Sequence, residues 1–189
     1  SWEIMGSYTD LSMSSSQQKE VTLSGRLFEN VRVIIQKTIS GNAGGGVQIS
    51  EIRFHVKRVF PPAAMTSDST IIDGRRFDAS ASSVASATNW PAYGAFNKRT
   101  TQDFGDGVPY GWACMGPSVY STDGTYQGSI STSVDGAAVG GEWVQLSLPD
   151  ESSIESLSVF SSSVGDGVPS SVVVACLLYT SPSPRDGLL

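Results

Sequence analysis

Alternation of hydrophobic and polar positions is clearest over residues 142–148 of this chain. Val144, Leu146 and Leu148 occupy every second position, and tryptophan or polar side chains lie between them. This period of two predicts a half-buried β-strand whose apolar face points into a core. We expect Pro149 to end the strand, because proline has no N–H group to donate to a neighbouring strand.

Shorter runs of the same kind recur along the chain, separated by glycine, serine, aspartate and proline. The predicted strands are residues 2–8, 21–23, 30–37, 47–55, 71–72, 77–84, 126–134, 142–148, 154–161 and 171–175. The apolar residues of 47–55 cannot all share one face of an unbroken strand, so we expect a β-bulge near Ser50 and Glu51. No run predicts more than one helical turn, which falls within 89–97, so the pattern is typical of an all-β sandwich or barrel.

Composition and charge narrow the possible functions. Hydrophobic residues make up 39% of the 189 residues, enough for a core, and charged residues only 16%, which argues against long solvated helices. The formal net charge of −6, without a basic block, disfavours nucleic-acid binding. No apolar run approaches the roughly 18 residues of a membrane-spanning helix.

The C-terminal stretch 176–189 does not continue the strand pattern. Residues 176–186 resemble the translation of a transposase-type adapter from sequencing libraries, and 187–189 would be index sequence. We therefore expect 176–189 to be an adapter-derived artefact and the natural chain to stop at Ala175, within a strand. A natural tail rich in proline and serine is the alternative. Cys114 would then be the only natural cysteine and a small buried hydrophobe, without a disulfide to Cys176.

Residues that commonly carry catalysis are sparse. The only histidine, His55, lies at the end of a predicted strand without a cysteine or histidine close in sequence, so we expect it at the surface. Many aspartates stand in Asp-Gly pairs, where they serve turn geometry. The chain has no Gly-x-Ser-x-Gly elbow, phosphate-binding loop or zinc-ligand spacing. These observations predict a protein that is not an enzyme, although a Ser-His-Asp arrangement assembled from distant residues stays open.

Three segments together resemble the discoidin, or coagulation factor 5/8 type C, family. They are residues 90–97 (WPAYGAFN), the pair Gly111-Trp112 and residues 141–146 (GEWVQL), and the small-residue run 79–83 fits the same pattern. Residues 60–67 (FPPAAMTS) are similar to the lead-in of repeat arrays of such domains. The resemblance implies a galactose-binding-like jelly-roll β-sandwich.

The resemblance also divides the chain. Residues 65–175 resemble the N-terminal two thirds of one discoidin-like domain, residues 1–56 resemble the C-terminal third of a preceding repeat, and 57–64 would be a linker. The two parts are complementary, and each alone would leave open sheet edges and half a core. We therefore expect them to complete one jelly roll as a circular permutant. In a native array, each part would instead pair within its own copy, beside neighbouring repeats.

The family implies a non-catalytic binding module whose ligand, most often a carbohydrate, lies on loops at one end of the sandwich. A sugar site needs an aromatic platform and a few fixed polar groups. The candidates for it are Trp90, Tyr93, Arg99, Tyr110 and Trp112. The alternative for three aromatics, Trp112, Phe96 and Trp143, is that they fill the core.

The expected partner is a glycan or glycoprotein at an extracellular, cell or virion surface, with no nucleic acid and no transmembrane segment. A protein or phospholipid ligand, a structural spacer in a fibre or surface array, and a targeting domain of a lost glycoside hydrolase are the alternatives. Some family members hold a structural calcium, for which Asn97 and Glu51 are the candidates here. Neutral Asn97 and the neighbouring cations Lys98 and Arg99 count against calcium, and no other cofactor is expected.

Overall fold

The structure, a computed structural model, describes residues 1–14, 17–23, 27–39, 46–55, 59–100, 107–114, 119–162 and 167–177. Nearly all of its regular elements are strands, and the exception is the short 3₁₀ helix η1 (Ala92–Phe96). The strands are β1 (Trp2–Tyr8), β2 (Gln18–Thr22), β3 (Leu27–Thr38), β4 (Gln48–His55), β5 (Val59–Phe60), β6 (Ser69–Ile72), β7 (Arg75–Ala81), β8 (Trp112–Ala113), β9 (Ser131–Val134), β10 (Ala137–Gly140), β11 (Glu142–Ser153), β12 (Ser156–Ser161) and β13 (Pro169–Leu177).

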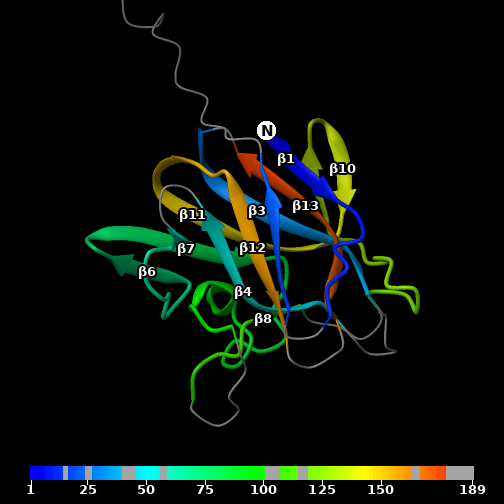
Figure 1. Cartoon of the computed structure of the whole chain (residues 1–189), viewed down its shortest axis with the longest axis horizontal. Helices are drawn as coiled ribbons and strands as arrows, with labels where there is room; N and C mark the ends of the chain where they lie inside the picture. Colours follow the sequence, from blue (N-terminus) through cyan, green and yellow to red (C-terminus); the bar gives the residue numbers. More distant parts are fainter. Residues whose placement is uncertain are drawn as a thin grey trace, which may run out of the picture.

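These strands form two sheets packed as a sandwich. One sheet has the order β10-β9-β1-β13-β3-β11-β7-β6, and the other β2-β12-β4-β5, with β8 paired to β4. Figure 1 shows the β6–β7 and β9–β10 hairpins at opposite sides of the molecule, where they form the two edges of the larger sheet. The expected all-β jelly-roll sandwich is therefore confirmed.

Among the described residues, no helix has the length and apolarity needed to cross a membrane.

Two of the N-terminal strands, β3 and β4, lie in the interior of the larger and the smaller sheet, respectively. β3 pairs with β11 on one side and β13 on the other, and β4 pairs with β12 and β5. Alternate residues of β3, namely Val31, Val33 and Ile35, point into the core between the sheets. The described residues of 1–55 and 69–177 therefore build one sandwich, as the complementarity of the two parts predicted, and β5 places part of the expected linker in the smaller sheet.

The strand predicted over 142–148 is confirmed as the first part of β11. Val144 and Leu146 are almost completely buried and Leu148 is 7% exposed. Pro149 does not end the strand, which continues to Ser153. The pairing with β3 is interrupted between Ser147 and Ser152, so proline sits where the ladder requires no N–H donor.

The predicted β-bulge in β4 is also confirmed. Glu51 pairs with Phe160 of β12, but the next pair joins Ile49 to Ser161, which leaves Ser50 as the extra residue. The bulge turns both Ser50 and Glu51 inward, and neither has exposed surface. The 3₁₀ helix η1 is the helical turn expected within 89–97.

A second, smaller apolar cluster lies on the outer face of the larger sheet. Its buried members are Ile34, Val134, Val173 and Ala175, and the partly buried Trp2, Val139 and Trp143 pack against them. The expectation that Trp143 fills the main core is therefore wrong. Neighbouring positions of a strand face opposite ways, so Trp143 points outward because Val144 points inward.

Arg32 joins the strands beneath this outer cluster. Its guanidinium carbon lies 3.7 Å from the ring centroid of Trp143 and 4.3 Å from that of Trp2. Its Nε and Nη2 donate to Oε1 of Gln145 at 3.2 and 2.8 Å, and Nη1 donates to Oγ1 of Thr132 at 2.9 Å. One side chain of β3 thus binds to β1, β9 and β11, and burial lowers its pKa to about 10.

Both cysteines are buried free thiols, so the prediction of no disulfide is confirmed. Val47 donates its N–H to Sγ of Cys114 at 3.2 Å, and burial raises the pKa of this thiol to about 12. Cys176 and Leu177, which begin the adapter-like stretch, extend β13 and pair with β1 and β3. Residues 178–189 lie outside the described residues, and the origin of this stretch stays a prediction.

Candidate functional site

Two of the predicted binding aromatics form a pair in the loops that flank η1. The rings of Trp90 and Tyr110 meet edge to face, with centroids 5.5 Å apart, and both side chains are partly exposed. The N–H of Tyr110 donates to the carbonyl of Asn89 at 2.9 Å, which ties the two loops together. This pair presents aromatic surface to solvent from a fixed backbone.

Tyr93, the third predicted loop aromatic, lies on η1. Pro91 precedes the helix in an extended conformation, and its carbonyl accepts the N–H of Gly94 at 3.1 Å. The N–H of Tyr93 donates to Oδ1 of Asp68 at 3.2 Å, while Phe96 is buried in the core. The partly exposed Tyr93 lines a cavity of about 280 Å³, whose other walls include Asn97, Val108 and Pro109. The aromatic loop site is defined here as the Trp90–Tyr110 pair together with Tyr93 and its cavity; neither Trp90 nor Tyr110 lines that cavity.

Gly111 separates an exposed aromatic residue from a buried one. Its φ is +133°, and a Cβ atom there would lie 2.2 Å from the carbonyl oxygen of Ile49, so only glycine fits. On its C-terminal side Trp112 is fully buried, and its Nε1 donates to the carbonyl of Ser83 at 2.9 Å. Trp112 is therefore a core residue, which corrects its place among the binding candidates and agrees with the alternative interpretation.

The two calcium candidates, Glu51 and Asn97, accept hydrogen bonds from consecutive backbone N–H groups. Oε2 of Glu51 accepts the N–H of Lys98 at 2.8 Å, and Oδ1 of Asn97 accepts the N–H of Arg99 at 3.0 Å. Arg99, the remaining binding candidate, is thus held on the loop that follows η1. The bulge in β4 aims Glu51 at this loop, which sequence separation alone does not reveal.

The chemistry of these groups does not fit calcium. Oε1 of Glu51 faces Nε of Arg53 at 3.5 Å, so both carboxylate oxygens already have donors. Burial raises the pKa of Glu51 to about 8, although the charges of Lys98 and Arg53 oppose the shift. A cation site needs several free oxygens and few competing cations. Within the described ranges, no three histidine, cysteine, aspartate or glutamate residues are grouped as metal ligands.

His55 forms a cross-strand hydrogen bond between β4 and β12. Its Nε2 lies 2.8 Å from Oγ of Ser158, and this oxygen also accepts Nε2 of Gln18 at 3.0 Å. His55 is partly buried rather than fully at the surface, and Ser158 has no exposed surface. A nucleophilic serine must be reachable by its substrate, so the contact is best described as structural.

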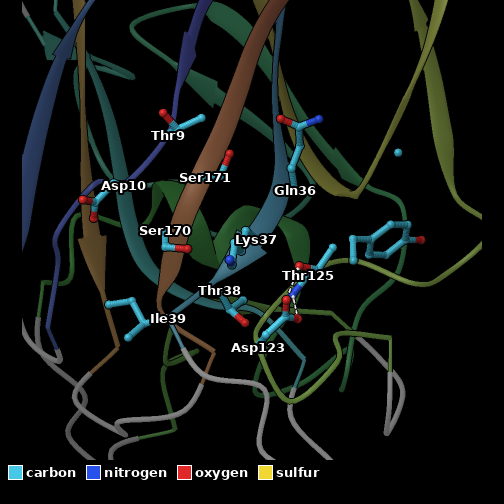
Figure 2. A pocket seen from close by; sticks show the side chains of 12 residues that line it. Thr9, Asp10, Gln36, Lys37, Thr38, Ile39, Asp123, Thr125, Ser170 and Ser171 are labelled. Carbon is cyan, nitrogen blue, oxygen red and sulfur yellow. Dashed lines mark hydrogen bonds between the residues drawn. The ribbon is translucent and has the colours of Figure 1, made fainter.

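A larger depression, which the sequence did not predict, opens beside the end of β3 (Figure 2). Its volume is about 770 Å³. Five separate stretches of chain contribute to it: the turn after β1, the end of β3, the segment around 123–126, the end of β10 and the start of β13. The lining residues are Thr9, Asp10, Gln36, Lys37, Thr38, Ile39, Asp123, Thr125, Tyr126, Gly140, Ser170 and Ser171. We call it the β3–β13 depression.

Asp123 is fixed within a tight turn at the rim of this depression. Oδ1 accepts the hydroxyl of Ser121 and the N–H of Thr125 at 3.0 Å, and Oδ2 accepts the Thr125 hydroxyl at 3.0 Å (Figure 2). These bonds lower the pKa of Asp123 to about 2. The turn is held against β3, because the N–H of Thr38 donates to the carbonyl of Gly124 at 2.9 Å.

Tyr126 forms an aromatic wall of the depression. Its N–H donates to the carbonyl of Gln36 at 3.0 Å, and its hydroxyl accepts the N–H of Ile130 at 2.9 Å. Its ring meets Tyr120 edge to face at 5.3 Å, and Tyr120 in turn donates to the carbonyl of Ile35. The only signal in the sequence is the Asp123-Gly124 turn between two tyrosines, which does not show that β13 and the turn after β1 join it.

Comparison of the chain with known protein families, with curated proteins and with solved structures finds no match.

Proposed function

We propose that this chain is a carbohydrate-binding module without a catalytic step of its own. The observation that carries the proposal is the aromatic loop site, where the partly exposed Trp90 and Tyr110 contact each other edge to face and the partly exposed Tyr93 lines a cavity. Pro109, the residue before Tyr110, lines the same cavity. Sugar rings have apolar faces edged by hydroxyls, and they stack on aromatic rings held beside polar groups.

The geometry favours this function over a structural spacer. A spacer requires only that the loop aromatics complete the core, as Phe96 and Trp112 do. Trp90 and Tyr110 instead keep part of their surface in solvent although their rings contact each other. The site is also held in place before a ligand arrives, because Gly111 and η1 fix the backbone on both sides. Glycans or glycoproteins of a cell or virion surface are the proposed partners.

A glycan-array screen followed by titration tests the proposal. Trp90→Ala and Tyr110→Ala should each weaken binding to the retained glycan by about tenfold or more, because central aromatic contacts carry most of the energy of small interfaces. Phe160→Ala is the matched control, since this half-buried aromatic lies on the smaller sheet beneath Arg53. If the folded wild-type chain retains no glycan, or if the control weakens binding as much as Trp90→Ala, the proposal is refuted.

A further inference from the structure

We infer that the β3–β13 depression is a second saccharide site, selective for uncharged sugars of two or more rings. This inference rests on the proposed function only in assigning the same class of ligand, and its residues are separate from the aromatic loop site. Its volume of about 770 Å³ lies within the roughly 300–1,000 Å³ typical of ligand pockets. It is well above the 280 Å³ beside Tyr93, so it accommodates a longer ligand.

The depression has an apolar wall next to polar groups. Tyr126 contributes a ring that is fixed by its hydroxyl bond to Ile130 and by Tyr120. Ile39, 47% exposed, adds aliphatic surface at the end of β3. Such a wall suits the apolar face of a sugar ring, and because it is already fixed, binding costs little ordering of side chains.

The polar lining suits hydroxyl groups rather than ions. Figure 2 shows Lys37, Asp123 and the hydroxyls of Thr125 and Ser170 around the depression, with Asp10 at another side. Two carboxylates and one ammonium give the lining a charge of −1, which disfavours sulfated or sialylated sugars. A cationic ligand would be repelled by the ammonium group of Lys37. A neutral sugar can donate to the carboxylates and accept from the lysine, so it uses charged groups of both signs.

The two aspartates retain capacity to accept further hydrogen bonds. A carboxylate has about four acceptor positions, and the turn of residues 121–125 fills three of those on Asp123. Asp10 accepts the Ser12 hydroxyl at Oδ1, at 2.9 Å, and its Oδ2 has no partner within the described part of the chain. Both groups can therefore receive sugar hydroxyls without breaking the bonds that hold the loops.

Two sites on one rigid sandwich allow the module to bind a glycan surface at two points at once. When one sugar is bound, the second site meets nearby sugars at a high effective concentration, and avidity can exceed either affinity by about 10²–10⁴ where the spacing fits. A dense glycan surface is the setting in which such an arrangement binds tightly.

The inference is tested by NMR titration of the full ¹⁵N-labelled chain with lactose, maltotriose and triacetylchitotriose, and with sialyllactose as the anionic probe. We expect at least one neutral probe to shift the amides of Lys37, Thr125 and Ser170. Lys37→Ala and Asp10→Asn should weaken that binding about five- to tenfold. Asparagine suits the left-handed backbone of Asp10, whose φ is +56°, so this variant keeps the turn.

Matched controls lie elsewhere on the surface. Lys19→Ala removes an exposed lysine from β2, and Asp73→Asn changes an exposed turn aspartate that also has a positive φ, of +53°. Neither should alter the titration. Ser170→Trp fills the depression and should abolish the shifts while the remaining spectrum stays folded.

The outcomes separate the two proposals. Shifts confined to the amides of Trp90, Tyr93 and Tyr110 overturn the second site and leave the proposed function standing. Shifts confined to the β3–β13 depression support the second site and refute the aromatic loop site. Tighter binding of sialyllactose than of every neutral probe overturns the selectivity, and the absence of shifts with all probes overturns both sites.

Discussion

Replacement of Arg32 by methionine should destabilise the sandwich more than the replacement of any exposed charged residue does. Methionine keeps the aliphatic length of the side chain, so the change removes the guanidinium and little packing. The guanidinium stacks between Trp2 and Trp143 and donates to two strands through Gln145 and Thr132. Its loss therefore releases contacts that join β3 to β1, β9 and β11 at once.

The size of the effect follows from these contacts. Each half-buried cation–π contact contributes about 1 kcal/mol. Each side chain that accepts hydrogen bonds from the charged guanidinium contributes about 1.5 kcal/mol. The gross contribution of about 5 kcal/mol is reduced by roughly half, because burying a cation is costly, as the lowered pKa of Arg32 indicates. We expect Arg32→Met to lower the free energy of unfolding by about 2–3 kcal/mol. Arg32→Lys should recover only part of it, since lysine lacks the planar fork.

Urea unfolding followed by tryptophan fluorescence measures this difference, provided that the m-value is unchanged. Arg75→Met is the control, because the ion pair of Arg75 with Asp150, at 2.8 Å, joins two side chains that are 63% and 60% exposed. Such pairs contribute about 0–1 kcal/mol. The reasoning fails if Arg32→Met and Arg75→Met lie within about 0.5 kcal/mol of each other.

Three further changes test other parts of the structure. Trp112→Ala should cost about 3–5 kcal/mol in urea unfolding, because it empties a fully buried site; a loss under 1 kcal/mol would contradict its core role. Gly111→Ala should cost about 2 kcal/mol or more, since its Cβ meets the carbonyl of Ile49, and should weaken glycan binding by displacing Tyr110. The pKa of Glu51 is raised to about 8 by burial, so the folded state binds the extra proton and the free energy of unfolding falls as pH rises from about 4.5 to 8. Glu51→Gln should remove that slope between pH 5 and 8, and an unchanged slope would refute the assignment.

Local pattern determined much of the fold in advance. The alternation of 142–148 predicted which face of β11 is buried, and the surplus of apolar residues in 47–55 predicted the bulge at Ser50. Both are properties of a few neighbouring residues, where side-chain direction follows from the period of two. The prediction that Pro149 ends the strand is wrong, because proline is tolerated where the pairing with β3 is interrupted, and that interruption is a property of two strands together.

The site could be predicted only in part, because it depends on long-range packing. Trp90, Tyr93 and Tyr110 were found as loop aromatics, but only the structure separates them from the buried Trp112. The β3–β13 depression combines five separate stretches of chain, and no local pattern marks such an assembly. The stacking of Arg32 was equally hidden, since Trp2 and Trp143 lie on strands that never pair with each other.

The central position of β3 governs the order in which this protein can fold during synthesis. Val33 needs Val144 on one side and Val174 on the other, so one edge of β3 stays open until β11 and the other until β13 has left the ribosome. Pairing over such separations is slow, and open apolar strands associate with one another. Until β13 is made, the nascent strands are consequently exposed to aggregation, and a chaperone that shields β3 during this interval would raise the yield of folded protein.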